Sequence, residues 1–166
     1  MLSKKIQEAL NKQITEEAYA ADFYLSMASW CDTRGFRGAA GFMYSHSEQE
    51  RMHLMKLFRY VNAAGGHAVV HETKKPPREY QSLQQVMEHT LEHERSLTKK
   101  INQLVDGCLT EKDYSTFNFL QWYVAEQHEE ERVLQQILDL MKISGADGRG
   151  LILVDKEIGS LSGKAS

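Results

Sequence analysis

The sequence predicts an all-α protein: a four-helix bundle with one long crossover between its second and third helices, followed by a short fifth helix. Two observations predict this fold. Glycine and proline cluster, so that long intervals carry no helix breaker, and within each interval apolar residues recur three and four positions apart. We therefore expect a single domain over 1–166, with the bundle over about 3–144 and the fifth helix over about 148–162.

Glycines delimit the first two predicted helices. The interval Ser3–Arg34 contains neither Gly nor Pro and ends at a Gly-Phe-Arg-Gly turn. The interval Ala39–Ala64 contains only Gly41 and ends at a Gly-Gly pair. Because glycine just after the last periodic residue is a common stop signal, each interval is expected to form one helix.

The second half of the chain repeats this organisation. The segment Gly66–Gln81 has a mixed composition and carries both prolines, so it is predicted to be the crossover. Ser82 is the expected N-cap of a third helix that reaches about Gly107. Thr110 is the expected N-cap of a fourth helix, which has acidic residues in its first turn and ends near Gly145. The apolar run Leu151–Val154 begins the fifth helix.

The lengths of the connections predict how these helices are arranged. Helices of about 26 to 32 residues are about 40 to 48 Å long. The connections at 34–38 and 108–110 are too short to travel that far, so helices one and two, and three and four, are expected to be antiparallel neighbours. The segment 66–81 spans up to about 50 Å when extended and can return the chain to the end where the second helix began.

Composition excludes several classes of function. Twenty Lys and Arg against 23 Asp and Glu give a formal charge of −3, so no nucleic-acid partner is expected. The two cysteines, Cys31 and Cys108, form no C-x-x-C pair, which excludes zinc ribbons and disulfide scaffolds and favours a cytoplasmic location. No stretch approaches the roughly 18 apolar residues of a membrane span, so no membrane partner is expected.

Polar residues interrupt the inward apolar stripe of each long helix near its middle. These residues are Glu17, Glu50, His53, Glu94, Gln127 and Glu130. Antiparallel helices of similar length bring their midpoints to one level, so the six side chains are expected to converge inside the bundle. A buried carboxylate is unfavourable unless it is paired, protonated or bound to a metal, and four of them at one level therefore indicate cations.

The charges and donor types indicate a dinuclear metal site. The four glutamates sum to −4, which two divalent ions would cancel, while His53 and Gln127 add neutral donors. Such a site is too rich in oxygen for structural zinc, and the loop spacing of an EF-hand is absent. Iron or manganese suits carboxylates with imidazole, and iron is favoured because carboxylates bind both Fe(II) and Fe(III).

Several motifs stand in order along the four helices: Glu17 with Tyr24, Glu50-x-x-His53, His93-Glu94, and the run 116–131, Thr-Phe-Asn-Phe-Leu-Gln-Trp-Tyr-Val-Ala-Glu-Gln-His-Glu-Glu-Glu. Together they closely resemble the bacterial-type non-haem ferritins, over about residues 3–161. The resemblance implies a ferritin-like bundle. It also implies a ferroxidase that oxidises Fe(II) with O2 or H2O2 and stores ferric oxyhydroxide mineral inside a homo-oligomeric cage of 24 subunits.

The resemblance also implies roles for individual residues. It implies a first iron bound by Glu17, Glu50 and His53, and a second bound by Glu50, Glu94 and Glu130, with Glu50 bridging. Gln127 borders this site, and Tyr24 resembles the family's tyrosine that supplies an electron. His46 lies one turn before the bridging glutamate and is expected to be a core histidine bonded to a carbonyl.

Two positions depart from related proteins. Many bacterial members have a third iron site, which would correspond here to Glu126, Glu129 and Glu130 with the residue before the bridging glutamate. That residue is Gln49, so the third site is expected to be weaker or altered. Bacterioferritins carry a haem-binding methionine directly after the bridging glutamate, where this chain has Arg51, and no haem is expected.

Two other classes of function stay open at this stage. A metal-free interaction bundle would have uninterrupted apolar seams, and a di-iron oxygenase would have a cavity for an organic substrate and usually a longer chain. The fifth segment favours storage. Its apolar residues, Leu151–Val154, Ile158 and Leu161, would be exposed in a monomer but could pack around a four-fold axis in a cage.

Overall fold

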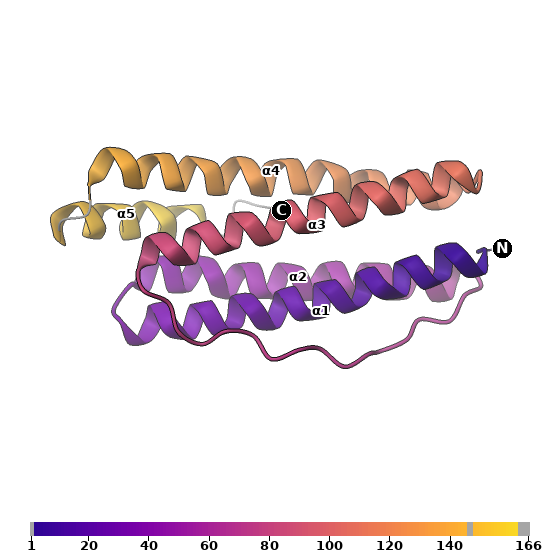
Figure 1. The fold of residues 1–166 in the computed structure, drawn as a ribbon, viewed down its shortest axis with the longest axis horizontal. Helices are drawn as coiled ribbons and strands as arrows, with labels where there is room; N and C mark the ends of the chain where they lie inside the picture. The colour runs from indigo at the N-terminus through magenta and orange to yellow at the C-terminus, as the bar shows by residue number, and fades with distance from the viewer. Residues whose placement is uncertain (1, 146–147, 163–166) are drawn as a thin grey trace.

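The computed structural model describes residues 2–145 and 148–162 and, over these ranges, contains helices and no strand. The helices are α1 (Lys4–Thr33), α2 (Arg37–Ala63), α3 (Leu83–Thr110), α4 (Tyr114–Ser144) and α5 (Gly148–Leu161). α1 lies beside α2 and α3 beside α4, while α5 packs against α2 and α4 at one end (Figure 1). The predicted fold class is confirmed. Residues 1, 146–147 and 163–166 of the predicted domain lie outside the described residues.

The crossover between α2 and α3 runs the length of the bundle along α1 (Figure 1). Asn11 fixes its beginning: the side-chain amide donates to the carbonyl of His67, and the amide oxygen accepts from the N–H of Val69, each at 3.0 Å. Near its other end, the hydroxyl of Ser26 donates to the carbonyl of Pro77 at 2.6 Å. As predicted, α3 therefore starts at the end where α2 started.

The side chain of the N-cap residue itself caps three of the helices, α1, α3 and α4, and one predicted cap is wrong. Ser3 and Ser82 cap α1 and α3 as expected. Thr110 does not cap α4 but is the last residue of α3, and Asp113 takes the capping role. One Asp113 oxygen accepts from the N–H of Thr116 at 3.0 Å and the other from its hydroxyl at 2.6 Å, so the carboxylate makes two bonds where a threonine hydroxyl would make one.

α2 begins at Arg37, two residues earlier than predicted, because α5 caps it. Phe36, at the N-cap position, has no capping side chain. Instead, the two carboxylate oxygens of Asp155 in α5 accept from the N–H groups of Gly38 and Ala39 at 3.0 and 2.8 Å. A negative charge at this end also interacts favourably with the helix dipole. The two helices touch closely, since a Cβ on Gly38 would lie 1.8 Å from the Asp155 carbonyl oxygen.

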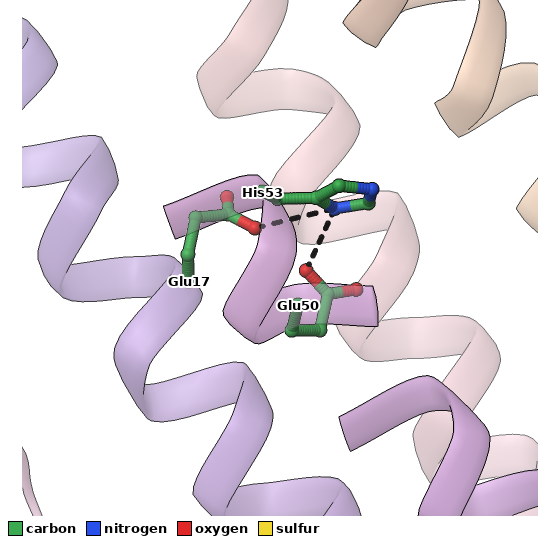
Figure 2. A group of neighbouring side chains, drawn as sticks. All are labelled: Glu17, Glu50 and His53. Atoms are coloured by element: carbon green, nitrogen blue, oxygen red, sulfur yellow. Dashed lines mark hydrogen bonds and ion pairs between the residues drawn. The ribbon is translucent and has the colours of Figure 1, made fainter. Parts of the chain in front are cut away.

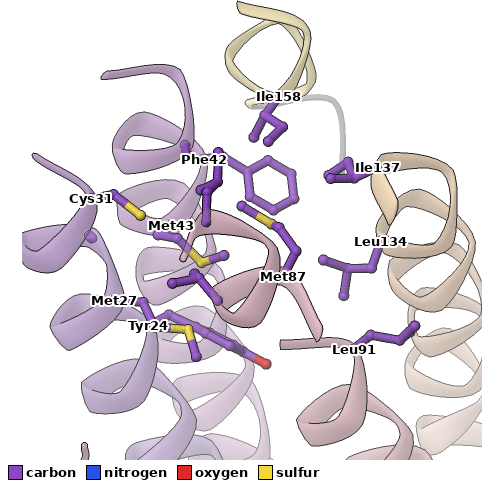
Figure 3. Packing of buried hydrophobic residues seen from close by; sticks show 14 of the residues in the cluster. Tyr24, Met27, Cys31, Phe42, Met43, Met87, Leu91, Leu134, Ile137 and Ile158 are labelled. Atoms are coloured by element: carbon purple, nitrogen blue, oxygen red, sulfur yellow. The ribbon is translucent and has the colours of Figure 1, made fainter. Parts of the chain in front are cut away.

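The interior contains two apolar clusters, one on each side of the middle of the bundle. One cluster lies towards α5 and includes Met27, Met43, Met87 and Ile158 (Figure 3). The other cluster fills the half of the bundle away from α5. It includes Leu10, Leu57, Ile101 and Leu120, one from each of α1 to α4. No helix within 2–145 and 148–162 is both long and apolar enough to cross a bilayer. The polar side chains between the clusters are described below.

The close approach of α2 and α5 gives a stability prediction. Gly38→Ala should destabilise the fold by about 1–3 kcal/mol, because its methyl group would overlap backbone that cannot rotate away. Gly41→Ala is the matched control in the same helix. Its Cβ would lie 3.8 Å from the nearest atom, so it should be neutral or stabilise by about 0.5–1 kcal/mol. Thermal unfolding measures both variants, and equal midpoints would contradict the packing described here.

Candidate metal centre

The polar side chains predicted to interrupt the seams lie together between the two apolar clusters. They are Glu17 of α1, Glu50 and His53 of α2, Glu94 of α3, and Gln127 and Glu130 of α4, and none is more than 7% exposed. α2 and α4 each supply two of them three residues apart, a spacing that places both side chains on one helix face. Each of the four long helices thus contributes at least one carboxylate to a single buried level.

The best-formed part of the site is the group Glu17, Glu50 and His53 (Figure 2). His53 Nδ1 lies 3.2 Å from Glu50 Oε2 and 3.7 Å from Glu17 Oε2. The other Glu17 oxygen accepts from the side-chain amide of Gln13 at 2.5 Å, but Oε2 is buried with no hydrogen-bond partner. One ligand atom from each of the three residues lies within 4.8 Å of the others, which suits a metal ion.

Burial and proximity set the protonation of this group. Burial, and then the charge of Glu17, raise the pKa of Glu50 well above its usual range. Burial acts in the same direction on Glu17, but the nearby His53 and Glu50 outweigh it and lower the pKa of Glu17. Burial opposes a charged His53, yet Glu17 raises its pKa. In the absence of metal, Glu50 therefore holds a proton beside the ionised Glu17.

Both oxygens of Glu94 are engaged by donors from neighbouring helices. The hydroxyl of Tyr24 donates to Oε1 in a short hydrogen bond, and the amide of Gln127 donates to Oε2 at 3.0 Å. Burial, followed by repulsion from Glu130, raises the pKa of Glu94 to about 7 despite these two bonds. Burial and the charge of Glu94 together raise the pKa of Tyr24 well above 10, so this phenol keeps its proton at neutral pH.

Glu130 is held by His46, which packs on the other side of Tyr24. His46 Nε2 lies 2.7 Å from Glu130 Oε2, and Nδ1 lies 3.2 Å from the carbonyl of Phe42. Since a carbonyl and a carboxylate both accept, the ring carries both protons when Glu130 is ionised. Burial opposes both charges, but their attraction raises the pKa of His46 and lowers that of Glu130. The bond to a carbonyl was expected from the sequence, whereas the pairing with Glu130 was not.

The two halves of the site therefore differ. Glu17, Glu50 and His53 present ligand atoms to one point, whereas Glu94 and Glu130 are bonded to Tyr24, Gln127 and His46 instead. Among the residues that the structure describes, no second group of this kind gathers around one point.

The residues predicted for a third site are spread out. Gln49 is buried on α2, next to the bridging position. Glu126 Oε1 lies 4.0 Å from the second nitrogen of His53, so it borders the site. Glu129 lies at the surface, where Arg132 donates to both of its oxygens at 2.7 and 2.5 Å.

Aromatic rings border the site. Trp122 and Tyr123 of α4 stack on each other at 4.6 Å, with their ring centroids 5.3 and 5.2 Å from His53. His93 of α3 packs against Tyr24 at 5.8 Å, and its buried Nε2 has no hydrogen-bond partner. Burial lowers the pKa of His93 to about 4, so the ring is neutral at physiological pH.

Comparison with known proteins agrees with this arrangement. A family model described as a ferritin-like domain matches residues 7–144. The chain belongs to the ferritin family. It is 50% identical to a bacterial non-haem ferritin-like protein of Haemophilus influenzae, over 99% of this chain and 100% of that protein. It is 48% identical to a bacterial non-haem ferritin of Campylobacter jejuni, over 98% and 97%. An open-pore ferritin of the archaeon Archaeoglobus fulgidus superimposes with a TM-score of 0.93 at 43% identity, covering 96% of this chain and 98% of that one.

Sequence reasoning missed three contacts that shape the site of this ferritin-family chain: those of Gln13 with Glu17, of His46 with Glu130, and of His93 with Tyr24. Gln13 lies four residues before Glu17, and His46 four residues before Glu50, so each is one turn away on the same face. That spacing was a usable signal for the contact between Gln13 and Glu17, whereas His46 pairs with Glu130 of another helix. No spacing signal marks His93, whose neighbours come from a different helix.

The raised carboxyl pKa values predict that the metal-free protein loses stability as pH increases through the folded pKa of Glu94, from about 6.5 to about 7.5. Glu94, with a pKa of about 7, and Glu50, whose pKa burial raises well above its usual range, retain protons in the folded chain that the unfolded chain has already released. The raised pKa of His46 acts in the same direction. Raising the pH therefore lowers the free energy of unfolding, and the thermal midpoint of chelator-treated protein should fall.

Glu94→Gln is the control for this pH dependence. It removes one of the titrating groups while keeping the side-chain volume, so the midpoint should fall less steeply with pH. A midpoint that rises over this range, or an unchanged slope in the variant, would count against the protonation assigned to the site.

Proposed function

We propose that this chain is a cytoplasmic iron-storage ferroxidase. It binds Fe(II) at a dinuclear carboxylate site, oxidises it with O2 or H2O2, and stores the ferric oxyhydroxide product inside a 24-subunit cage; iron is thus its substrate and its cargo. The observation that carries the proposal is the buried group Glu17, Glu50 and His53, with an unpartnered carboxylate oxygen on Glu17. Family membership and the non-haem ferritin names of its relatives support it. Haem has no part in the proposal, since Arg51 follows Glu50.

The first Fe(II) binds Glu17, Glu50 and His53 in this proposal. Two carboxylates and an imidazole suit Fe(II). The ion replaces the proton that Glu50 holds, so the repulsion between Glu50 and Glu17 becomes a shared attraction to the metal. It also satisfies the Glu17 oxygen that has no partner.

The second Fe(II) binds Glu50, Glu94 and Glu130, with Gln127 at the border of the site. Glu94 Oε2 must leave its bond with Gln127, while Oε1 keeps the bond with Tyr24, and Glu130 must turn from His46, so this ion follows the first. The negative charge of the four ionised glutamates balances the positive charge of two ferrous ions. Oxidation adds positive charge that the carboxylates no longer balance, which favours uptake of oxide or hydroxide from water. Tyr24, bonded to Glu94, is placed to supply a further electron.

The third site is proposed to be weak in this chain. A glutamine at position 49 offers one amide oxygen in place of a charged carboxylate. Arg132 engages both oxygens of Glu129 at the surface, and only Glu126 approaches His53.

The apolar surface of α5 supports assembly into a cage, and the state of the two cysteines supports a cytoplasmic location. Ile152 and Leu153 are 71% and 61% exposed in the isolated chain, next to the buried Val154. Burying such side chains between copies of the chain around a symmetry axis would remove them from water.

Cys31 and Cys108 are both buried and unpaired, which suits a reducing compartment.

Glu50→Gln is expected to reduce the initial rate of Fe(II) oxidation at least about tenfold, because it removes the bridging carboxylate. Stopped-flow absorbance after mixing Fe(II)-loaded protein with O2 or H2O2 measures this rate. Glu48→Gln is the matched control, since Glu48 is exposed on the same helix and should keep the wild-type rate. Unsaturable oxidation in the wild type, or equal rates in the two variants, would refute the ferroxidase proposal.

Anaerobic Fe(II) titration of the same proteins tests the stoichiometry. The wild type should saturate at two tightly bound ions per chain, and Gln49→Glu should add a third. A wild type that binds a third ion as tightly as the first two would contradict the weak third site.

The cage is tested by the mass of the purified protein in native buffer. Light scattering should give about 460 kDa, twenty-four times the 19.0 kDa of the chain. Ile152→Asp should shift the protein to smaller species, because it would bury a charge between copies, whereas the same change at the exposed Val70 of the crossover should not. A monomer or dimer in the wild type would rule out storage in a cage.

A further inference from the structure

Four rings connect the candidate metal centre to the outside of the bundle. Tyr19, Phe23 and Tyr24 come from α1, and His93 comes from α3. His93 lies at the centre of the group, with its ring centroid 5.8 Å from Tyr24, 4.8 Å from Phe23 and 5.7 Å from Tyr19. Phe23 also contacts both tyrosines, at 5.5 and 5.8 Å. The four side chains form one continuous aromatic contact.

The two tyrosines occupy opposite ends of this group. Tyr24 is fully buried, and its hydroxyl donates to Glu94 of the candidate site. Tyr19 is only partly buried and lies beneath the crossover, where Lys74 Nζ is 4.6 Å from its ring centroid. One phenol therefore contacts the site and the other reaches the protein surface.

The chemical identities of the rings determine which of them can pass an electron to an oxidised Tyr24. The rings that contact Tyr24 are Phe23, His46 and His93. A benzene ring or an imidazole is harder to oxidise than a phenol, so none of them can easily reduce an oxidised Tyr24. Among the described ring contacts, Tyr19 is the phenol that lies one ring further, in contact with two of these neighbours.

We propose that Tyr19 reduces Tyr24 after Tyr24 has donated an electron to the metal centre, with His93 as the bridging ring. The inference rests on the proposed ferroxidase function, which provides O2 or H2O2 as the oxidant.

Each tyrosine gives up one electron and one proton in this transfer. Tyr24 loses one electron to the oxidant being reduced at the iron site, and its phenolic proton passes to Glu94. Tyr19 then loses one electron to the Tyr24 phenoxyl and one proton to water, while Glu94 returns its proton to Tyr24. The Tyr19 phenoxyl is finally reduced by a one-electron donor in solution, such as a thiol. Tyr24 is thereby restored, and the oxidising equivalent leaves the buried carboxylates and imidazoles of the site.

Freeze-quench electron paramagnetic resonance tests the proposal. Fe(II)-loaded wild type, Tyr19→Phe and Tyr24→Phe are mixed with H2O2 and sampled over time. The wild type should show a short-lived tyrosyl radical, and Tyr24→Phe should abolish it. In Tyr19→Phe, the radical should stay on Tyr24 and live severalfold longer, while the first turnover of Fe(II) oxidation proceeds at the wild-type rate. Peptide mapping of wild type quenched with a spin trap should find the adduct on Tyr19.

Variants at His93 separate the bridge from simple packing. His93→Phe keeps an aromatic ring and should preserve the short radical lifetime, whereas His93→Leu should lengthen it. Tyr114→Phe is the control, because Tyr114 is 66% exposed at the start of α4, outside the ring group, and should not change the decay.

Two results would overturn the inference while leaving the ferroxidase proposal intact. One is normal Fe(II) oxidation with the same radical decay in Tyr19→Phe and wild type. The other is an adduct or radical on Trp122, the ring beside His53, in place of Tyr19. Absence of Fe(II) oxidation in the wild type would instead refute the proposed function itself.

Discussion

Four carboxylates buried at one level of a helical bundle are the constraint on which the rest of this structure depends. Each is stabilised by a different neighbour. Glu50 keeps a proton, and Glu17 lies beside His53. Glu94 accepts from a phenol and an amide, and Glu130 pairs with the imidazole of His46. The apolar clusters on either side hold the helices in register, so these groups stay at one level without help from solvent.

These neighbours make the site unequal on its two sides. Beside His53, the buried charge of Glu17 is only partly stabilised, since one of its carboxylate oxygens has no hydrogen-bond partner. Both oxygens of Glu94 accept hydrogen bonds and Glu130 pairs with His46, so any ion that binds there competes with donors already in place. Two chemically similar sets of ligands can thus differ in how easily they bind a metal ion, because the hydrogen-bond partners of the ligands differ.

The sequence predicts the path of the chain and the level of the site because both depend on periodicity and on breakers. Ser3 and Ser82 begin helices as expected, since a serine before an apolar stripe is a local signal. Thr110 fails because Asp113, three residues later, binds the same helix end with two oxygens. The start of α2 is also missed, because its cap comes from a distant part of the chain.

The hydrogen-bond partner of each carboxylate in the site is the part that the sequence does not determine. Glu130 and Glu129 are adjacent glutamates, yet one turns inward to His46 and the other outward to Arg132. Helical periodicity separates the two faces, but the partner of each carboxylate depends on rotamers and on helices that lie far away in the sequence.

The cap that Asp155 places on α2 has a consequence for the order of folding. Its carboxylate lies 117 and 116 residues after the two amides that it binds. During synthesis, the first turn of α2 therefore remains without its cap until nearly the whole chain has left the ribosome. Contacts of such long sequence separation form late. The helix that carries Glu50 and His53 is completed only when the last helix docks, so a chain released too early would lack a finished site.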